Sequence, residues 1–351
     1  MFFNPSRFLI LFNAERMSLV ENIVWTISNL CRGSPPPPNE ITQPVIYPLV
    51  SFLEKSFSNE AKIDVLWALS YLSDGDNERI EKVLSSGVAT TLIQLLENKE
   101  MKTKSKTPIV RILGNFVSGN DSQTQAVLDA GILIHLAGLM GSQSKSIRKE
   151  SSWLASNIAC GNHAQITTLL QEPRVLTKII KNAKYDTWEV RKEALWALAN
   201  ICTTGTHSHT IIMVNAGGLE PLITVLKLTH IETDLLIAVL DALRKILEAG
   251  ECVDSGNYQH IVEEHNGIDY LEELQTHPSE IVYEKVVNLI EDYFGVQDDG
   301  DENLAPATND QGTYNFGLAP GIASPKQLFK NFGATENIPF ENRSTNTRLL
   351  F

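Results

Sequence analysis

Five pairs of side chains, each pair four residues apart, recur along the chain at nearly constant spacing. The pairs are Trp25 with Asn29, Trp67 with Tyr71, Arg111 with Asn115, Trp153 with Asn157, and Trp196 with Asn200. Successive pairs are separated by 42, 44, 42 and 43 residues. A four-residue gap places both side chains on one face of a helix. A row of indoles and amides on such a face predicts a surface that binds an extended peptide.

The residue types at these positions suit a basic peptide. An asparagine amide is both donor and acceptor, so it can pair with the backbone of an extended chain. Indole faces accept the aliphatic stems of lysine or arginine and attract their charged heads. Acidic residues lie three positions before three of the tryptophans, on the same helical face: Asp64, Glu150 and Glu193. They would supply the opposite charge.

A helical tryptophan is often simply part of the core. Here Leu66, Leu69 and Leu72 already form an apolar stripe around Trp67, and packing gives no reason for a polar amide to recur one turn from each indole. We therefore favour binding over core. Arg111 stands where the series would place a tryptophan, and two interpretations stay open. It reflects drift between repeats, or it is a positive charge that divides the basic-binding face or holds a ligand carbonyl or carboxylate.

A period in the low forties indicates stacked helical repeats. Each repeat reads as a short helix, a break, a longer apolar helix and a helix that carries the pair. The breaks are at Gly87, Gly131, Pro173, Gly217 and, less regularly, Gly267. Three helices per repeat are typical of armadillo repeats, whereas HEAT repeats have two. We predict an all-α fold, an armadillo-repeat right-handed superhelical solenoid.

The repeats divide the chain into three expected segments. Residues 1–33 form a partial armadillo repeat, residues 34–295 about six repeats, and residues 296–351 a disordered tail rich in Asp, Asn, Gly and Pro. The loop Pro35–Pro38 cannot be helical. Only 24 residues precede Trp25, too few for two helices, so we expect truncation on the N-terminal side. The apolar stretch at 8–12 is read as part of a repeat helix.

Charge and composition exclude several classes of partner. The chain has 29 Lys and Arg against 42 Asp and Glu, a net charge of −13, so its field repels nucleic acid and anionic membranes and attracts basic partners. No apolar run approaches the length of a membrane span. We expect neither nucleic acid nor membrane among its partners.

Catalytic and metal-binding motifs are absent from the sequence, which predicts a protein that is not an enzyme and has no cofactor or metal. There is no nucleophile elbow, phosphate-binding loop or zinc-protease motif. His207 and His209 are read as loop residues. Four scattered cysteines are interpreted as buried, reduced thiols of a cytosolic or nuclear protein: Cys31, Cys160, Cys202 and Cys252.

Longer stretches around the pairs resemble the importin alpha (karyopherin alpha) family. Val24 to Gly33, followed by prolines, resembles the fourth armadillo repeat of that family, and Leu66 to Gly75 resembles the fifth. Arg111 to Gly119, Glu150 to Gly161 and Glu193 to Asn200 resemble the sixth, seventh and eighth. The resemblance covers roughly residues 8 to 305, and so about the fourth to the tenth repeat.

This resemblance implies an adaptor that binds lysine-rich and arginine-rich nuclear localisation signals in a concave groove and moves between cytoplasm and nucleus. It implies a minor signal site made of Arg111, Asn115, Asp121, Glu150, Trp153, Asn157, Glu193, Trp196 and Asn200. It also implies a remnant of the major site, with the groove centre, made of Trp25, Asn29, Asp64, Trp67 and Tyr71.

Two further partners belong to this family. Its export receptor would contact residues 251–295, while importin beta binds a basic N-terminal segment that this sequence does not show, so we expect no direct binding of importin beta. Two functions are therefore considered. The chain is an import adaptor, or it is a truncated scaffold or decoy that holds basic cargo without transporting it.

Overall fold

The computed structural model describes residues 16–33, 35–55, 58–98, 101, 103–252, 258–295, 307–308 and 314–315. The chain separates into two compact units, Met1–Gly295 and Val296–Phe351. In the second unit, β1 (Ala307–Thr308) pairs antiparallel with β2 (Tyr314–Asn315). The rest of the tail that was expected to be disordered lies outside the described residues, as does the apolar stretch at 8–12.

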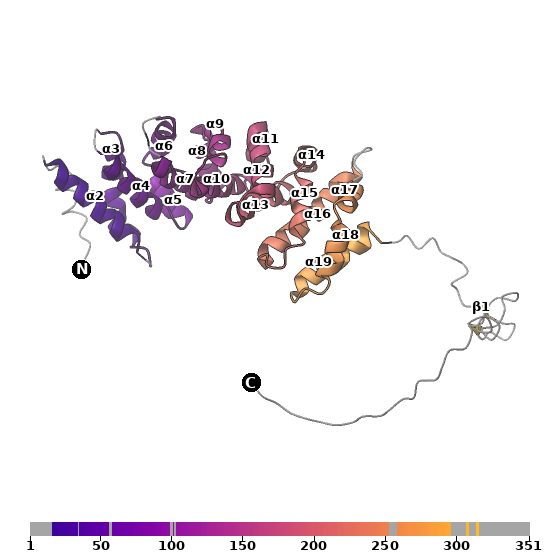
Figure 1. Cartoon of the computed structure of the whole chain (residues 1–351). Helices are drawn as coiled ribbons and strands as arrows, with labels where there is room; N and C mark the ends of the chain where they lie inside the picture. Colours follow the sequence, from indigo (N-terminus) through magenta and orange to yellow (C-terminus); the bar gives the residue numbers. More distant parts are fainter. Residues whose placement is uncertain are drawn as a thin grey trace, which may run out of the picture. The chain divides into compact units, whose positions relative to one another are not determined.

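The first unit is a stack of helices, coloured from indigo at α2 to orange at α19 in Figure 1. Its spine consists of the helices that carry the residue pairs and their successors, which we call the ladder helices. They are α2 (Met17–Cys31), α4 (Asn59–Leu72), α7 (Thr103–Val117), α10 (Lys145–Ala159), α13 (Trp188–Thr204), α16 (Thr233–Glu251) and α19 (Glu280–Tyr293). Each ladder helix packs against the next. The predicted all-α armadillo solenoid is confirmed.

Two further helices precede most ladder helices. The short first helices are α5 (Asn77–Leu84), α8 (Asp121–Asp129), α11 (His163–Leu170), α14 (His207–Asn215) and α17 (Tyr258–Glu264). The second helices are α6 (Val88–Glu97), α9 (Leu133–Met140), α12 (Pro173–Tyr185), α15 (Leu219–Val225) and α18 (Gly267–Leu274).

One unit departs from the expected three helices. Between α2 and α4, the described residues form a single helix, α3 (Asn39–Leu53). Residues 35–38 of the proline loop are not helical. Proline has no N–H to donate within a helix, and its ring clashes with the preceding turn. The run of four prolines therefore stands where the other units have a short first helix. The sequence-based expectation that this loop is not helical is confirmed for residues 35–38.

The breaks between first and second helices lie where the sequence placed them. Gly87, Gly131 and Gly217 have φ values of 78°, 95° and 89°, a left-handed conformation that side chains with a Cβ rarely adopt. Pro173 opens α12, where its missing N–H costs no helical hydrogen bond.

The core runs through the stack as one continuous apolar cluster. Leu66, Leu69 and Leu72 of α4 are buried, as the apolar stripe beside Trp67 predicted. The apolar second helices also bury leucines in the core, among them Leu92 and Leu96 of α6, whereas Leu95 of the same helix is only partly covered. The ladder side chains therefore lie beside the core stripe.

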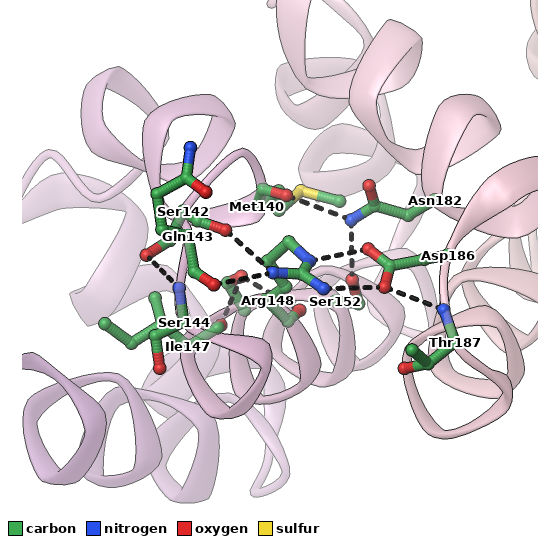
Figure 2. A network of polar contacts seen from close by, with 11 residues as sticks. Met140, Ser142, Gln143, Ser144, Ile147, Arg148, Ser152, Asn182, Asp186 and Thr187 are labelled. Atoms are coloured by element: carbon green, nitrogen blue, oxygen red, sulfur yellow. Dashed lines mark hydrogen bonds and ion pairs between the residues drawn. The ribbon is translucent and has the colours of Figure 1, made fainter.

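A polar network joins two neighbouring repeats at the turns between second and ladder helices (Figure 2). Arg148 of α10 donates from Nε and Nη2 to both carboxylate oxygens of Asp186, at 2.6 and 2.8 Å, and from Nη1 to the carbonyl of Ser142 at 2.9 Å. Asn182 of α12 donates to the carbonyl of Met140 at 3.2 Å. Side-chain bonds thus hold the start of α10 to the end of α12.

Replacing Arg148 by Ala should remove a bidentate, mostly buried ion pair and lower the free energy of unfolding by about 2 kcal/mol, measured from the urea midpoint by circular dichroism. The Arg148 hydrogen bond holds the pKa of Asp186 below its ordinary value. This stabilisation is therefore present at neutral pH, and the difference from wild type should shrink as the pH falls through the lowered pKa.

Lys145→Ala is the matched control. Lys145 pairs with Glu189 at 2.9 Å, but both side chains are about half exposed, so its removal should change stability much less than the Arg148 substitution does. Equal losses for the two variants would contradict the structural role of the Arg148 network.

Candidate functional site

Amides of the ladder helices bond across to the preceding ladder helix. From Nδ2, Asn115 donates to the Ser70 carbonyl at 2.9 Å, Asn157 to the Gly114 carbonyl at 3.4 Å, and Asn200 to the Ser156 carbonyl at 3.0 Å. Each accepting residue is small and directly precedes the second member of the previous pair. The repeating asparagines thus join consecutive repeats, a role that the sequence reading did not assign to them.

The asparagines differ in how much of the side-chain amide remains available to a ligand. Asn115 is 4% exposed, and it also donates from Nδ2 to Ser73 Oγ at 3.0 Å, so its amide is enclosed within the stack. Asn157 and Asn200 are half-buried, and their Oδ1 atoms accept no bond from the described residues. They can therefore hold a neighbouring helix and still accept from a peptide N–H. Asn29 is exposed and bonds only to its own helix, at the Trp25 carbonyl.

The tryptophans stand beside these amides and are only half covered. Trp153 lies over Gly114 of α7, where an added Cβ would come within 2.4 Å of the indole Cζ3 atom. A glycine is therefore required beneath this ring. Trp67 stacks on Tyr71 with ring centroids 6.0 Å apart and planes 23° apart. Trp25 is 58% exposed.

Arg111 lies opposite an acidic residue of the next ladder helix. Its Nη1 is 3.7 Å from Glu150 Oε1, and the Glu150 side chain is only 13% exposed against 42% for Arg111. This pair places a positive charge on the ladder face between Tyr71 and Trp153. Arg111 thus pairs with a carboxylate of its own chain. This ion pair is compatible with both interpretations of Arg111, drift between repeats and contact with a ligand.

Glu193 occupies an acidic and partly dehydrated position between two other carboxylates. Burial raises its pKa above the ordinary value, nearby Glu150 and Glu232 raise it further, and Lys149 and Lys192 oppose the shift. Lys192 is itself bonded to Glu232 at 2.9 Å. A carboxylate with a raised pKa is poorly compensated, so an added cation at this face would be stabilised.

Burial also raises the pKa of Asp64, another acidic residue of the ladder face.

Asp121, in contrast, lies on first helix α8 rather than on a ladder helix. Its carboxylate accepts from Asn162 Nδ2 at 3.0 Å, and its carbonyl accepts from Gln165 Nε2 at 2.7 Å. Asp121 therefore takes part in a second row of contacts, which joins the first helices.

The series of side-chain pairs continues beyond the fifth pair with charged residues that the sequence analysis did not identify. Asp241 and Lys245 of α16 follow Trp196 and Asn200 by 45 residues, so the spacing alone was a sufficient signal. Asp241 forms an ion pair with Lys285 of α19. Internal ion pairs thus replace indole and amide at this end of the face.

Two expectations about reactive side chains are corrected. His207 and His209 belong to helix α14, and His209 Nδ1 accepts from the Thr206 N–H at 3.1 Å as part of the helix cap, so they are not loop residues. Cys31 and Cys202 are buried, and burial raises the pKa of each thiol to about 12. Cys160 and Cys252 are exposed because each directly follows the end of a helix.

Within the part of the chain that the structure describes, no group of three or more His, Cys, Asp or Glu residues could hold a metal ion. Over the same residues, no helix has both the length and the apolar character needed to cross a bilayer.

Repeat patterns and solved structures define the class of protein. The Armadillo/beta-catenin-like repeat matches residues 120–160, and the Atypical Arm repeat matches residues 257–307. A designed armadillo repeat protein in complex with peptide (KR)4 is 28% identical with a TM-score of 0.61, covering 69% of this chain and 98% of its own. Another designed armadillo repeat protein is 27% identical with a TM-score of 0.61 over 70% of this chain and 98% of its own. The chain is an armadillo-repeat protein.

Curated relatives give the family. Importin subunit alpha-3 of Arabidopsis thaliana is 36% identical over 315 residues, which cover 86% of this chain and 57% of the relative. Importin subunit alpha-1a of Oryza sativa subsp. japonica is 34% identical over 319 residues, 89% of this chain and 60% of the relative. The chain belongs to the importin alpha family, and it spans less than two thirds of the length of these relatives.

The raised pKa of Glu193 predicts that its ionised carboxylate lowers the stability of the folded protein. Glu193→Gln should raise the urea midpoint at pH 7, because the amide carries no charge to dehydrate. A raised native pKa means that wild-type stability falls as the pH rises through it, so the advantage of the variant should disappear as the pH is lowered through that pKa.

Glu189→Gln provides the control, because the Lys145 hydrogen bond lowers the pKa of this exposed residue to about 2. That substitution should not raise the midpoint. A Glu193→Gln protein less stable than wild type at pH 7 would contradict the assigned environment.

Proposed function

We propose that this chain is a non-enzymatic nuclear import adaptor whose ladder face binds lysine-rich and arginine-rich localisation signals. The observation that carries the proposal is the alternation, along α10 and α13, of half-buried indoles with acidic residues one turn earlier. Glu193, one of these acids, has a pKa raised by burial, which Lys149 and Lys192 only partly offset. The importin relatives and the designed protein in complex with (KR)4 support the same class of ligand.

The geometry suggests how a basic peptide would be held. Successive ladder helices repeat at a constant interval, which suits a ligand in extended conformation rather than a folded one. The Oδ1 atoms of Asn157 and Asn200 would accept backbone N–H groups. Lysine or arginine stems would lie against the indoles of Trp153 and Trp196, with their charges near Glu150 and Glu193.

Not every residue of the proposed minor site has the same role. Asn115 is enclosed, so we assign it to positioning α7 against α4 rather than to direct contact. Asp121 would act from the adjoining first helix. Arg111, paired with Glu150, would separate the minor site from the proposed centre and major-site remnant: Trp25, Asn29, Asp64, Trp67 and Tyr71.

The family resemblance extends the proposal to location and a second partner. An adaptor of this kind is present in both cytoplasm and nucleus. Its export receptor would contact residues 251–295, which include α17, α18 and α19.

The tryptophans provide the first test. Trp153→Ala with Trp196→Ala should weaken binding of a lysine-rich peptide by on the order of 2 kcal/mol, about thirtyfold, because aromatic anchors dominate such interfaces. Fluorescence anisotropy would measure the loss. The control is Trp188→Ala, a tryptophan of α13 outside the ladder that lies 6.0 Å from the Arg191 guanidinium. Unchanged affinity of the double variant, with an intact circular dichroism spectrum, would refute the proposal.

Charge provides the second test. Glu150→Lys with Glu193→Lys should abolish most binding of the same peptide, and wild-type affinity should fall as salt rises, because solvent-exposed charges are screened over about 8 Å near physiological ionic strength. Glu272→Lys with Glu273→Lys makes the same change in net charge on exposed positions of α18 and should leave affinity within about twofold. Similar losses from both pairs of substitutions would show that net charge, not the ladder, controls binding.

A further inference from the structure

Helix α12 carries a basic stripe in an otherwise acidic protein. Val175, Leu176, Ile179 and Ile180 of this helix are buried in the core. Its opposite side carries a stripe at helical spacing, made of Arg174, Lys178, Lys181 and Tyr185. The helix contains no acidic residue, although the chain as a whole has a net charge of −13.

The charges of this stripe are largely uncompensated. Within the described residues, Lys178 and Lys181 form no ion pair, and Arg174 meets only the flanking Glu172, at 3.3 Å. The fourth cation of the helix, Lys184, points elsewhere and pairs with Glu220 of α15. Tyr185 ends the stripe and is 76% exposed. Positive potential therefore persists along the middle of α12.

An open hollow adjoins the stripe. It has a volume of about 430 Å³ and is lined by Ala137, Gly138, Pro173, Arg174, Thr177 and Lys178. All of these residues belong to the second helices α9 and α12, so the hollow does not open on the ladder side chains. Ile134, one turn before Gly138 on α9, is 72% exposed and lines a second hollow that also includes Gly138. The surface thus combines free cations, an apolar side chain and a depression.

Gly138 has no steric explanation within the chain. It lies inside helix α9, where glycine lowers stability relative to alanine, yet an added Cβ would meet no heavy atom within 4 Å. Gly114, by comparison, is needed to accommodate Trp153. A helical glycine that nothing in its own chain requires is expected where another molecule comes close to the backbone.

We propose that this surface, formed by Ile134, Gly138, Arg174, Lys178 and Lys181, docks an acidic segment of a partner protein that also carries an apolar side chain. The carboxylates would meet Lys178 and Lys181, while the apolar group would enter the hollow over Gly138 beside Ile134. A short acidic peptide fits better than a nucleic acid, because the net charge of −13 repels a long polyanion beyond the local patch. Since the hollow and the ladder involve different helices, both can be occupied together.

The probe for the test is a fluorescein-labelled amphipathic peptide of about fourteen residues rich in glutamate and leucine, with affinity measured by anisotropy on the full chain. Lys178→Glu with Lys181→Glu should weaken binding about tenfold, because two attractions become two repulsions. Lys227→Glu is the control, since Lys227 is exposed and, in the described structure, forms no ion pair. It should change affinity by less than about twofold.

Gly138→Leu tests the hollow without relying on charge. An added Cβ at this position meets no heavy atom within 4 Å, and leucine favours a helix more than glycine does, so the variant should fold with a Tm at least equal to wild type. It should nevertheless lose about tenfold in affinity for the same peptide, because leucine fills the hollow. The Trp153→Ala and Trp196→Ala variant should keep full affinity for the acidic peptide, which separates this surface from the ladder.

Three results would overturn the proposal. Wild-type protein that fails to bind the probe at millimolar concentration is the first. The second is retained affinity in Gly138→Leu or in the Lys178 and Lys181 double variant. The third is equal or tighter binding of a single-stranded DNA oligonucleotide or an all-glutamate peptide, since either would show attraction to negative charge alone.

Discussion

The hydrogen bond from a ladder asparagine to a carbonyl of the preceding ladder helix is the interaction that aligns α4, α7, α10 and α13, the helices that carry most of the candidate site. Asn115, Asn157 and Asn200 each form it. Because the accepting residues are small, the helices approach closely enough for the bond, and the same approach brings Trp153 onto Gly114. Within these four helices, one repeated contact therefore holds neighbouring repeats together and helps to set the separation of the half-exposed indoles.

That arrangement makes stability and binding compete at the same residues. Glu193 is held between Glu150 and Glu232 in a partly buried position, where its ionised form is unfavourable until a cation arrives. Arg111 already supplies such a cation to Glu150, whereas Asp241 and Lys285 compensate one another. Glu193, whose burial Lys149 and Lys192 only partly offset, thus lies between two regions that the chain neutralises for itself.

One second helix carries chemistry opposite to that of the ladder face. Acids accompany the indoles on the ladder helices, while Arg174, Lys178 and Lys181 follow the outer stripe of α12. A three-helix repeat permits this separation, because the second helix buries one side against the ladder helix and leaves the other free. One chain can therefore present distinct surfaces to a basic peptide and to an acidic one.

The period, the helices, the glycine breaks and the position of the pairs could be predicted from the amino-acid sequence, because they follow from local spacing and backbone preference. The role of each polar side chain became clear only from the packed structure. Packing enclosed Asn115, placed Asp121 in the row of first helices and set His209 Nε2 2.9 Å from Thr167 Oγ1 of the preceding first helix. It also left Gly138 beneath an open hollow. Such outcomes depend on residues about forty positions away along the chain, which pack against the side chain only when the repeats stack.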